Sequence, residues 1–379
     1  MLDPRPVFYV VGLAVLALGG AMIAPALTDA AHGSANWRAF ALASAISIFF
    51  GGAVAGACRE SRSEGLSRQQ SFLLTTVVWL ALPLFAALPF MIGSPSANFA
   101  DAFFEAMSGL TTTGSTVFTG LDRMDRGTLL WRGILHWIGG LGIIIFAVAF
   151  LPTLRVGGMQ LFKAEAFDTL GKILPRAAEI AQSLGWVYLA LTAVCMLAYA
   201  AAGMTVFDAT VHAMSTISTG GFANYDTSFE EFGASIEYIC VVFMVLSALP
   251  FIRFVQLVNG DATPLWKDPQ VRAFLFAASA AVAALYLYLE VDGDGVTSAP
   301  FRKSLFNIVS VMTGTGFASA DYGLWGAFPV TLIFIVGFLG GCSGSTACSC
   351  KIFRYQVLLS AAANQVRRLQ APHGVFITR

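Results

Sequence analysis

The chain alternates long apolar runs with short polar segments. The runs without a charged residue include Val7–Leu27, Ala39–Cys58, Ser71–Ala100, Ala273–Leu289 and Tyr322–Cys350. Because a helix needs roughly 20 apolar residues to cross a bilayer, these runs predict membrane-spanning helices. The first run is too long, and is followed too soon by a second, to be a cleaved signal peptide. We therefore expect an all-α polytopic membrane protein whose first two helices form a hairpin.

A polar segment rich in glycine, serine and threonine occurs three times between the apolar runs. The three copies are Met107–Thr116, Met214–Ala223 and Val309–Ala318. When the copies are placed in register, three serines and three glycines coincide: Ser108, Ser215 and Ser310, and Gly114, Gly221 and Gly316. A repeat of this kind indicates a repeated structural unit.

Each copy stands in the same order of predicted elements, namely an outer helix, a half-length helix, a polar turn and an inner helix. In the first unit these are Ser71–Ile92, Ala100–Gly109, Thr111–Thr116 and Gly127–Leu154. In the second they are Ala177–Ala202, Asp208–Thr216, Ser218–Ala223 and Phe232–Val258. In the third they are Ala273–Leu289, Ser304–Met312, Thr313–Ala318 and Tyr322–Leu369, the last interrupted at Gly340–Thr346. The predicted domains are residues 1–70 (hairpin and loop), 71–155, 156–260 (with a linker) and 261–379.

Composition supports a membrane protein and argues against other classes. The chain is 57% hydrophobic and 12% charged, which is about half the charge of a soluble domain. Its formal net charge is zero, so no basic surface indicates nucleic acid. Cys342, Cys348 and Cys350 lie in an apolar run without a nearby histidine or carboxylate, so we expect neither a metal cluster nor a disulfide framework. No nucleophile–base set or nucleotide motif indicates an enzyme.

Charged residues predict the orientation of the helices. Basic residues gather in the loops of one side: Arg59, Arg62, Arg68, Arg155, Lys163, Lys172, Arg176, Lys267, Arg272, Arg367 and Arg368. The opposite loops carry Asp101, Asp122, Asp125, Asp208, Asp226, Glu230, Glu231, Asp292, Asp294 and Asp321. Because Lys and Arg mark the cytoplasmic side, we expect both termini inside the cell and half helices that enter from outside. We expect most of the acidic residues to be solvated.

The polar turns suit the binding of an alkali cation. Non-helical backbone at membrane depth is tolerated only where protein buries it or where it lines a water-filled cavity. Glycine reaches dihedral angles closed to other residues, and threonine adds a hydroxyl oxygen. Rings of such oxygens replace the hydration shell of an alkali cation. Each half helix directs its partially negative C-terminus at the turn. The competing interpretation is that small residues merely let helices pack closely.

Several motifs carry a resemblance to the Trk/Ktr-type potassium transporter family, in its Trk branch. They are the three turns, Trp131–Gly142, Gln160–Glu165, Pro175–Glu179 and Gly340–Thr346. The resemblance extends from the first helix to about Arg368. It implies a bacterial cytoplasmic (inner) membrane protein that takes up potassium as its substrate, without a covalent cofactor. It also implies a homodimer in the lipid bilayer and a cytoplasmic nucleotide-binding regulatory subunit, which we expect to contact the basic loop Arg155–Arg176.

The family arranges four such repeats around one pore, and one glycine per repeat lines the selectivity filter. Carried over, the resemblance assigns potassium binding to Thr112, Thr113, Gly114, Ser218, Thr219, Gly220, Gly221, Thr313, Gly314, Thr315 and Gly316. It assigns an intramembrane gate below the filter to Gly340, Gly341, Cys342, Ser343, Gly344, Ser345 and Thr346. Glycine and hydroxyl residues in this segment also predict a break in the helix.

Three features depart from the family pattern. Only three repeats are present, so the alternative function is a truncated, non-conducting remnant or fragment of such a transporter. The gate segment continues as Ala347-Cys348-Ser349-Cys350, where the family usually has glycines. Gly314 stands where the first and second repeats have Thr112 and Thr219, which removes one side-chain oxygen.

Some ionisable residues lie within the predicted membrane region. Arg132 and His136 on the first inner helix could face the ion path, although Arg132 could equally snorkel to the surface. Glu105 and His212 on the half helices are expected to brace them rather than to bind the ion. Lys351 and Arg354 follow the gate segment, and either anchor it at the membrane surface or sense an ion or partner.

Overall fold

The computed structural model describes residues 3–59, 66–149, 177–291 and 297–370. These residues form helices and connecting loops, together with an isolated bridge between Leu339 and Cys350. Among them, five helices are long and apolar enough to cross a membrane, or six if one bent pair counts as a span. The predicted all-α membrane fold is therefore confirmed. The predicted end of the first inner helix and the basic stretch 155–176 lie outside the described residues.

The N-terminal hairpin consists of α1 (Arg5–Ala21), α2 (Ile23–Ala31) and α3 (Trp37–Ala57). α1 and α3 come close because two glycines face each other: a Cβ added at Gly51 would lie 2.7 Å from the carbonyl oxygen of Gly12. Small residues allow this approach between membrane helices. Asp29 at the end of α2 accepts hydrogen bonds from the backbone N–H of Gly127 (2.5 Å) and the amide of Asn36 (2.7 Å). The bond from Gly127 attaches the hairpin to the first repeated unit, and the bond from Asn36 closes the hairpin itself.

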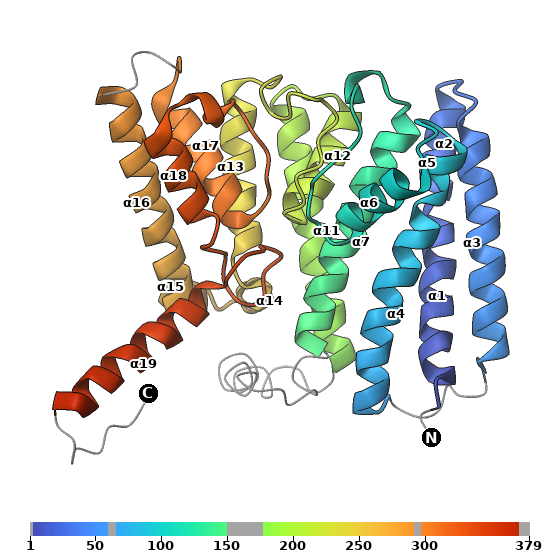
Figure 1. The fold of residues 1–379 in the computed structure, drawn as a ribbon, viewed down its shortest axis with the longest axis horizontal. Coiled ribbons are helices and arrows are strands. Elements are labelled where there is room, and N and C mark those ends of the chain that lie inside the picture. The colour runs from blue at the N-terminus through green and yellow to red at the C-terminus, as the bar shows by residue number, and fades with distance from the viewer. Residues whose placement is uncertain (1–2, 60–65, 150–176, 292–296, 371–379) are drawn as a thin grey trace.

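The three repeated units follow in chain order (Figure 1). The first contains α4 (Arg68–Ala86), α5 (Leu88–Ile92), the half helix α6 (Phe99–Leu110), η2 (Leu121–Arg123) and the inner helix α7 (Arg126–Ala149). The second contains α11 (Ala177–Ala201), the half helix α12 (Val206–Ile217), α13 (Ala234–Ala248) and α14 (Phe251–Val258). The third contains α15 (Thr263–Lys267), α16 (Pro269–Val291), the half helix α17 (Pro300–Thr313), η4 (Tyr322–Leu324), α18 (Ala327–Val336) and α19 (Ile352–Gln370).

Two inner helices differ from the prediction. An unbroken second inner helix over Phe232–Val258 is wrong, because α13 and α14 meet at an angle of 94°. Pro250 explains the bend, since proline lacks an N–H and disfavours helical geometry in the residue before it. The third inner helix is interrupted as predicted, but the gap between α18 and α19 is longer than Gly340–Thr346. In Figure 1, α19 leads away from the bundle instead of continuing the line of α18.

Each repeated unit has its own cluster of buried hydrophobic side chains. The first cluster includes Trp131 of α7 and Ala106 of α6, and it continues into the hairpin through Phe40. The second surrounds the half helix α12 and includes Tyr188 and Phe229. The third joins α16, α17 and α18. The half helices therefore lie between outer and inner helices, and their turns are supported on several sides.

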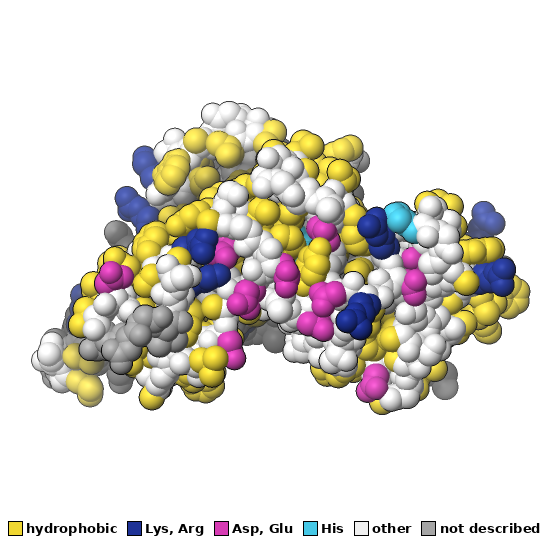
Figure 2. Space-filling model, turned by 90° about the horizontal axis from the view of Figure 1, so that it is seen from above, with side chains coloured by type: hydrophobic (Ala, Val, Ile, Leu, Met, Phe, Trp, Pro, Cys, Tyr) yellow, Lys and Arg dark blue, Asp and Glu magenta, His cyan; other side chains and the backbone are white. Residues whose placement is uncertain are grey.

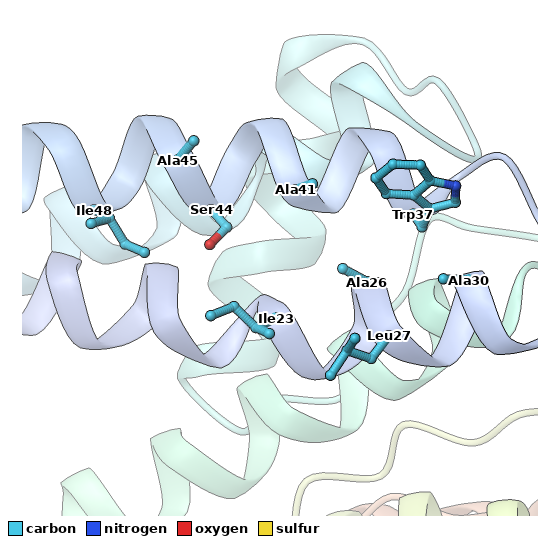
Figure 3. Close-up of a pocket in the computed structure, with 9 residues that line it drawn as sticks. All are labelled: Ile23, Ala26, Leu27, Ala30, Trp37, Ala41, Ser44, Ala45 and Ile48. Atoms are coloured by element: carbon cyan, nitrogen blue, oxygen red, sulfur yellow. The ribbon is translucent and has the colours of Figure 1, made fainter.

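A groove of about 530 Å³ lies between α2 and α3 of the hairpin (Figure 3). Its wall is made of alkyl and small side chains, with the indole of Trp37 toward one end. The hydroxyl of Ser44 in this wall donates a hydrogen bond to the carbonyl oxygen of Gly19 at 2.7 Å. Because its polar side chain is satisfied within the hairpin, the groove suits contact with lipid hydrocarbon.

The arrangement agrees with the predicted orientation. In Figure 1 the first helix begins at the lower edge, and the half helices α6, α12 and α17 lie in the upper part of the bundle. Figure 2 shows the upper face, where acidic side chains lie along the middle with some arginine and lysine side chains among them. This face is therefore the one that the charge pattern assigns to the outside.

We expect the glycine contact between α1 and α3 to be essential for the hairpin. Gly51→Val should destabilise the protein by about 1–3 kcal/mol, because the added side chain forces two tightly packed helices apart. Gly20→Val is the matched control, since a Cβ at Gly20 meets nothing within 4 Å. Thermal unfolding in detergent measures both variants. Equal melting temperatures for the two would contradict the proposed packing.

Candidate functional site

Two of the half helices, α6 and α12, start at side-chain caps, and all three end at the polar turns. The side chain of Asn98 accepts a hydrogen bond from the backbone N–H of Asp101 (3.0 Å) at the start of α6. Thr205 does the same for Asp208 (3.1 Å) at the start of α12. α17 begins with Pro300, whose missing N–H is not needed at a helix start. The last carbonyl groups of each helix have no partner further along it, so they face the turn.

The backbone of the three turns repeats an unusual conformation. The glycines Gly114, Gly221 and Gly316 have φ angles of 79°, 88° and 80°. Two positions earlier, φ is also positive: 55° at Thr112, 51° at Thr219 and 74° at Gly314. A β-branched residue in this region is a genuine outlier, and such strain costs of order 1–3 kcal/mol and gathers at functional sites. In the third turn this position is Gly314, and glycine adopts a positive φ without this strain.

The three turns lie against one another in sequence order. A Cβ added at Gly114 would collide with the carbonyl oxygen of Gly220, and one added at Gly221 would collide with that of Thr315. A Cβ added at Gly316 would meet nothing within 4 Å. The predicted site residues of the three units are therefore brought together. The first turn touches the second, the second touches the third, and the third has an open side.

Threonine hydroxyls of two turns bond to each other. Thr111 and Thr113 pair at 2.7 Å, and Thr313 and Thr315 pair at 2.8 Å. Thr313 and Thr315 are fully buried, whereas Thr113 is exposed. Among the described residues, no group of three His, Cys, Asp or Glu side chains is placed to hold a metal ion. Carbonyl and hydroxyl oxygens are therefore the ligands that these turns can offer.

A buried ion pair supports the first and second turns from behind. The guanidinium of Arg132 lies 2.8 Å from the carboxylate of Glu105, and both side chains are nearly inaccessible. Arg132 also donates to the carbonyl oxygen of Ala223 at 2.8 Å and lies over the ring of Phe222 at 4.1 Å. The possibility that Arg132 snorkels is therefore wrong, because its charge is neutralised inside the protein. The expectation that Glu105 acts as a brace is confirmed.

His136 is also buried and is held by two backbone groups. Its Nδ1 is 2.8 Å from the carbonyl oxygen of Gly109, and its Nε2 accepts a hydrogen bond from the N–H of Phe222 at 3.1 Å. The ring stacks on Phe222 at a centroid distance of 4.1 Å. Because both ring nitrogens have backbone partners, the imidazole links the first half helix to the second turn.

Two acidic residues have structural partners: Asp208, which is buried against the expectation that most such residues are solvated, and Asp226, which is exposed. Asp208 is 7% exposed and accepts from the side chain of Asn224 at 2.8 Å. Asp226 accepts from the backbone N–H groups of Gly120 (2.8 Å) and Leu121 (3.1 Å) in the loop after the first turn. These carboxylates hold the segments that leave the turns, where backbone groups would otherwise lack partners.

The predicted gate segment is non-helical, and its backbone is tied to the bend of the second inner helix. The N–H of Cys342 donates to the carbonyl oxygen of Ala248 at 2.9 Å, and the N–H of Phe251 donates to that of Gly344 at 3.0 Å. The hydroxyl of Thr346 lies 3.1 Å from the carbonyl oxygens of both Ile217 and Ser247. Ile217 is the last residue of α12, so the gate segment contacts the base of the second turn.

The residues that directly follow the gate segment meet the third turn. The N–H of Cys348 donates to the carbonyl oxygen of Thr313 at 3.3 Å. A side chain at Gly314 would collide with the Cys348 thiol, so the absence of a threonine there makes room for Cys348. The amine of Lys351 donates to the carbonyl oxygen of Ala347 and lies 3.5 Å from that of Ser345. Lys351 therefore holds the gate segment itself and does not simply extend into the membrane surface.

This fold and site define a class of protein. Half helices that enter a membrane protein from one side and end at adjoining, strained, oxygen-rich turns are typical of proteins that carry cations across a membrane. The interrupted helix beside the turns is compatible with the same class.

Comparison with known proteins identifies the family. Residues 37–379 match the family TrkH, described as cation transport protein. Trk system potassium uptake protein TrkI of Halomonas elongata is 40% identical over 312 residues, which cover 82% of this chain and 63% of that protein. TrkH of the same organism is 37% identical over 381 residues, covering 99% of this chain and 79% of that protein. The crystal structure of the potassium transporter TrkH from Vibrio parahaemolyticus superimposes with a TM-score of 0.90 at 35% identity, covering 100% of this chain and 79% of that one.

The chain therefore belongs to the TrkH family of cation transport proteins. It is an integral membrane protein of the transporter class and not an enzyme. The predicted family resemblance is confirmed over nearly the whole chain. It spans about 63–79% of the length of these relatives.

Sequence reasoning missed several residues that support the turns. Asn224, Glu237 and Asn307 were not predicted to take part, yet each is buried. Glu237 lies 2.8 Å from the amine of Lys303, which also donates to the carbonyl oxygen of Ser319 at 2.6 Å. A signal was available for Asn307, because a polar residue stands nine positions before each turn glycine.

The contacts between turns predict unequal tolerance of a methyl group. Gly114→Ala, Gly221→Ala and Gly316→Ala share the backbone strain of a positive φ, which costs about 1–3 kcal/mol. Only the first two place the methyl group against a neighbouring carbonyl oxygen. Gly114→Ala and Gly221→Ala should therefore lower the melting temperature more than Gly316→Ala does. An equal loss at all three positions would show that the turns do not pack in this way.

Proposed function

We propose that the chain forms the ion-selective wall of a potassium uptake pore. Potassium would be bound by backbone carbonyl and hydroxyl oxygens of Thr112, Thr113, Gly114, Ser218, Thr219, Gly220, Gly221, Thr313, Gly314, Thr315 and Gly316. The proposal rests on two features of the three turns. Each turn has a positive φ at the same two positions, and the turns contact one another. Left-handed residues at alternate positions let successive carbonyl groups point to one side, and a ring of such groups can replace an ion's water.

Electrostatics supports a cation as the ligand. Three helix C-termini face the turns, and each carries a partial negative charge. The acidic side chains on the outer face would raise the local concentration of cations at the entrance. The Halomonas and Vibrio relatives are named as potassium uptake proteins or potassium transporters. Potassium is the cation that these names indicate.

We propose that the segment Gly340–Thr346 gates the ion path. Its contacts with the base of α12 and, through Cys348, with the third turn support this role. These two contacts connect the segment to the ends of the half helices α12 and α17. A shift of the segment would therefore displace both turns.

Assembly into a homodimer and control by a cytoplasmic nucleotide-binding subunit are proposed on the family relationship alone. The relatives are named as parts of a Trk system, which is compatible with further components. Residues 155–176, the proposed docking loop, lie outside the described part of the chain.

The alternative is a membrane protein of this family that binds the ion without conducting it. The open space beside Gly316 supports this alternative. At the equivalent glycines, Gly114 and Gly221, the carbonyl oxygen of the next turn fills this space. A conducting pore needs a further wall on this side, since exposed polar backbone in lipid costs several kcal/mol per group. Two measurements distinguish the alternatives: ion binding to the purified protein, and uptake of a labelled potassium substitute into proteoliposomes. Binding with uptake indicates a conducting pore, and binding without uptake indicates the alternative.

Potassium binding predicts ion-specific stabilisation. The purified protein should melt at a higher temperature in potassium chloride than in sodium chloride of equal concentration, because a ligand of the folded state stabilises it. Gly221→Ser should reduce this difference by at least roughly half, since a side chain there displaces a ring carbonyl. Gly20→Ser, in open space on α1, is the control. Identical melting of the unchanged protein in both salts would rule out a potassium-selective site.

The gate proposal predicts that loosening the segment increases flux. Thr346→Val keeps the side-chain volume but removes the hydroxyl that bonds to Ile217 and Ser247. Potassium flux in proteoliposomes should rise about 2- to 10-fold, because a net hydrogen bond contributes about 0.5–1.5 kcal/mol to holding the segment in place. Ser343→Ala is the matched control, since that hydroxyl has no hydrogen-bond partner. A lower flux with Thr346→Val, with Ser343→Ala unchanged, would contradict a blocking role.

A further inference from the structure

One polar residue recurs on the buried face of every half helix, nine positions before the turn glycine. These residues are Glu105, His212 and Asn307, and none is accessible to solvent. Each accepts a hydrogen bond from the backbone N–H three positions after the glycine. The distances are 3.1 Å from Val117 to Glu105, 3.4 Å from Asn224 to His212 and 3.3 Å from Ser319 to Asn307. The three units share this bond although the accepting group is a carboxylate, an imidazole and an amide.

We propose that Glu105, His212 and Asn307 are positioning residues that set the height and width of the potassium-binding turns. The inference rests on the proposed function and adds residues that do not touch the ion. Each bond joins the half helix before a turn to the extended segment after it, so the turn is closed into a loop of fixed size. Such a loop holds its carbonyl oxygens at a fixed spacing, which is the requirement for preferring one ion over another.

In the first unit the bond is charged and reaches the second turn. The carboxylate of Glu105 also accepts from the hydroxyl of Thr116, at 2.8 and 2.9 Å. Its partner Arg132 donates to the carbonyl oxygen of Ala223, two residues after Gly221. A change at Glu105 therefore disturbs two turns and leaves a buried charge unpaired, which makes it unsuitable as the first test.

In the second unit the imidazole acts as a neutral acceptor. The Nδ1 atom of His212 lies 2.8 Å from the carbonyl oxygen of Asp208, which requires a proton on Nδ1 and leaves Nε2 free to accept from Asn224. The ring is enclosed by aromatic side chains, including Phe229 and Phe232 at centroid distances of 5.4 and 5.1 Å. This pocket would also accept a phenyl ring.

In the third unit an amide performs the same task. The side-chain oxygen of Asn307 accepts from the N–H of Ser319. Its amide nitrogen donates to the carbonyl oxygen of Lys303 at 2.8 Å and to the Ser319 hydroxyl at 3.2 Å. The amine of Lys303 donates to the Ser319 carbonyl oxygen as well. An Asp in place of Asn307 would keep the acceptor for Ser319, but it would lose the two donated bonds and bring a carboxylate oxygen close to the Lys303 carbonyl oxygen. It therefore tests the acceptor alone.

The competing interpretation is that these side chains only satisfy buried backbone groups. It explains why some acceptor is present, but not why the acceptor stands at the same register and bonds to the same position in all three units. The two interpretations differ in one measurable respect. A purely structural residue affects stability in potassium and in sodium equally, whereas a positioning residue changes the difference between the two ions.

The test compares Asn307→Leu, Asn307→Asp and Ser304→Ala by melting temperature in potassium and in sodium chloride, and by hydrogen exchange of the segment that contains Ser319. Ser304 is the matched control because it is buried on the same helix and its hydroxyl has no hydrogen-bond partner. Asn307→Leu should speed exchange roughly tenfold or more and reduce the difference between the salts by at least half. Asn307→Asp, which keeps the acceptor, should exchange more slowly than Asn307→Leu and retain more of the difference between the salts, and Ser304→Ala should change neither quantity.

Three outcomes have distinct meanings. Faster exchange with an unchanged difference between the salts overturns the positioning role and leaves a structural one. Unchanged exchange in Asn307→Leu overturns the bond itself. If the unchanged protein shows no difference between the salts, the proposed function fails, whereas the exchange measurement still tests the bond. Should Asn307→Leu not fold, His212→Phe removes the corresponding acceptor within a pocket that accepts the ring, and the same outcomes apply to the segment that contains Asn224.

Discussion

The structure depends on one constraint: backbone that leaves a helix inside a membrane must find hydrogen-bond partners within the protein. Several kcal/mol per unsatisfied group would otherwise oppose folding. The three turns and the gate segment all break helical bonding at this depth. Buried side chains of Glu105, His136 and His212 satisfy the backbone around the turns. Consequently the polar residues of this protein lie behind the turns, and the turns themselves can present carbonyl oxygens to an ion.

The buried ion pair of Arg132 and Glu105 illustrates how the units are joined. Removing either partner would leave an isolated charge, which is far more costly than the pair is stabilising. Because Arg132 also bonds to Ala223, the pair fixes the first unit relative to the second. Between the second and third units, Glu237 of α13 pairs with Lys303 of α17 at 2.8 Å. Backbone and hydroxyl bonds support this link, with Phe229 donating to Ala318 at 2.9 Å and Ala318 donating to Ser228 at 3.2 Å. An ion pair therefore contributes to the contact between each pair of adjacent units.

The bend at Pro250 and the interruption before α19 depend on each other. The carbonyl oxygen of Ala248 has no helical partner at the bend and accepts a hydrogen bond from the N–H of Cys342. The N–H of Phe251 donates to the carbonyl oxygen of Gly344. Two broken helices therefore complete each other's hydrogen bonds. Movement of the gate segment would leave the bend unsatisfied unless other groups replaced these bonds, which makes the bend a part of any gating motion.

Much of the architecture was determined by the sequence itself. Apolar length and the threefold register predicted the spans, the half helices and the turns, because the bilayer imposes length and depth on each segment. The family resemblance and the choice of Glu105 and His212 as braces were also correct. The sequence did not reveal that Arg132 is neutralised by Glu105, that His136 bonds to Phe222, or that Asp208 is buried, since these contacts join residues from different elements. Local patterns report the length and polarity of a segment, whereas the partner of a buried charge is chosen by tertiary packing.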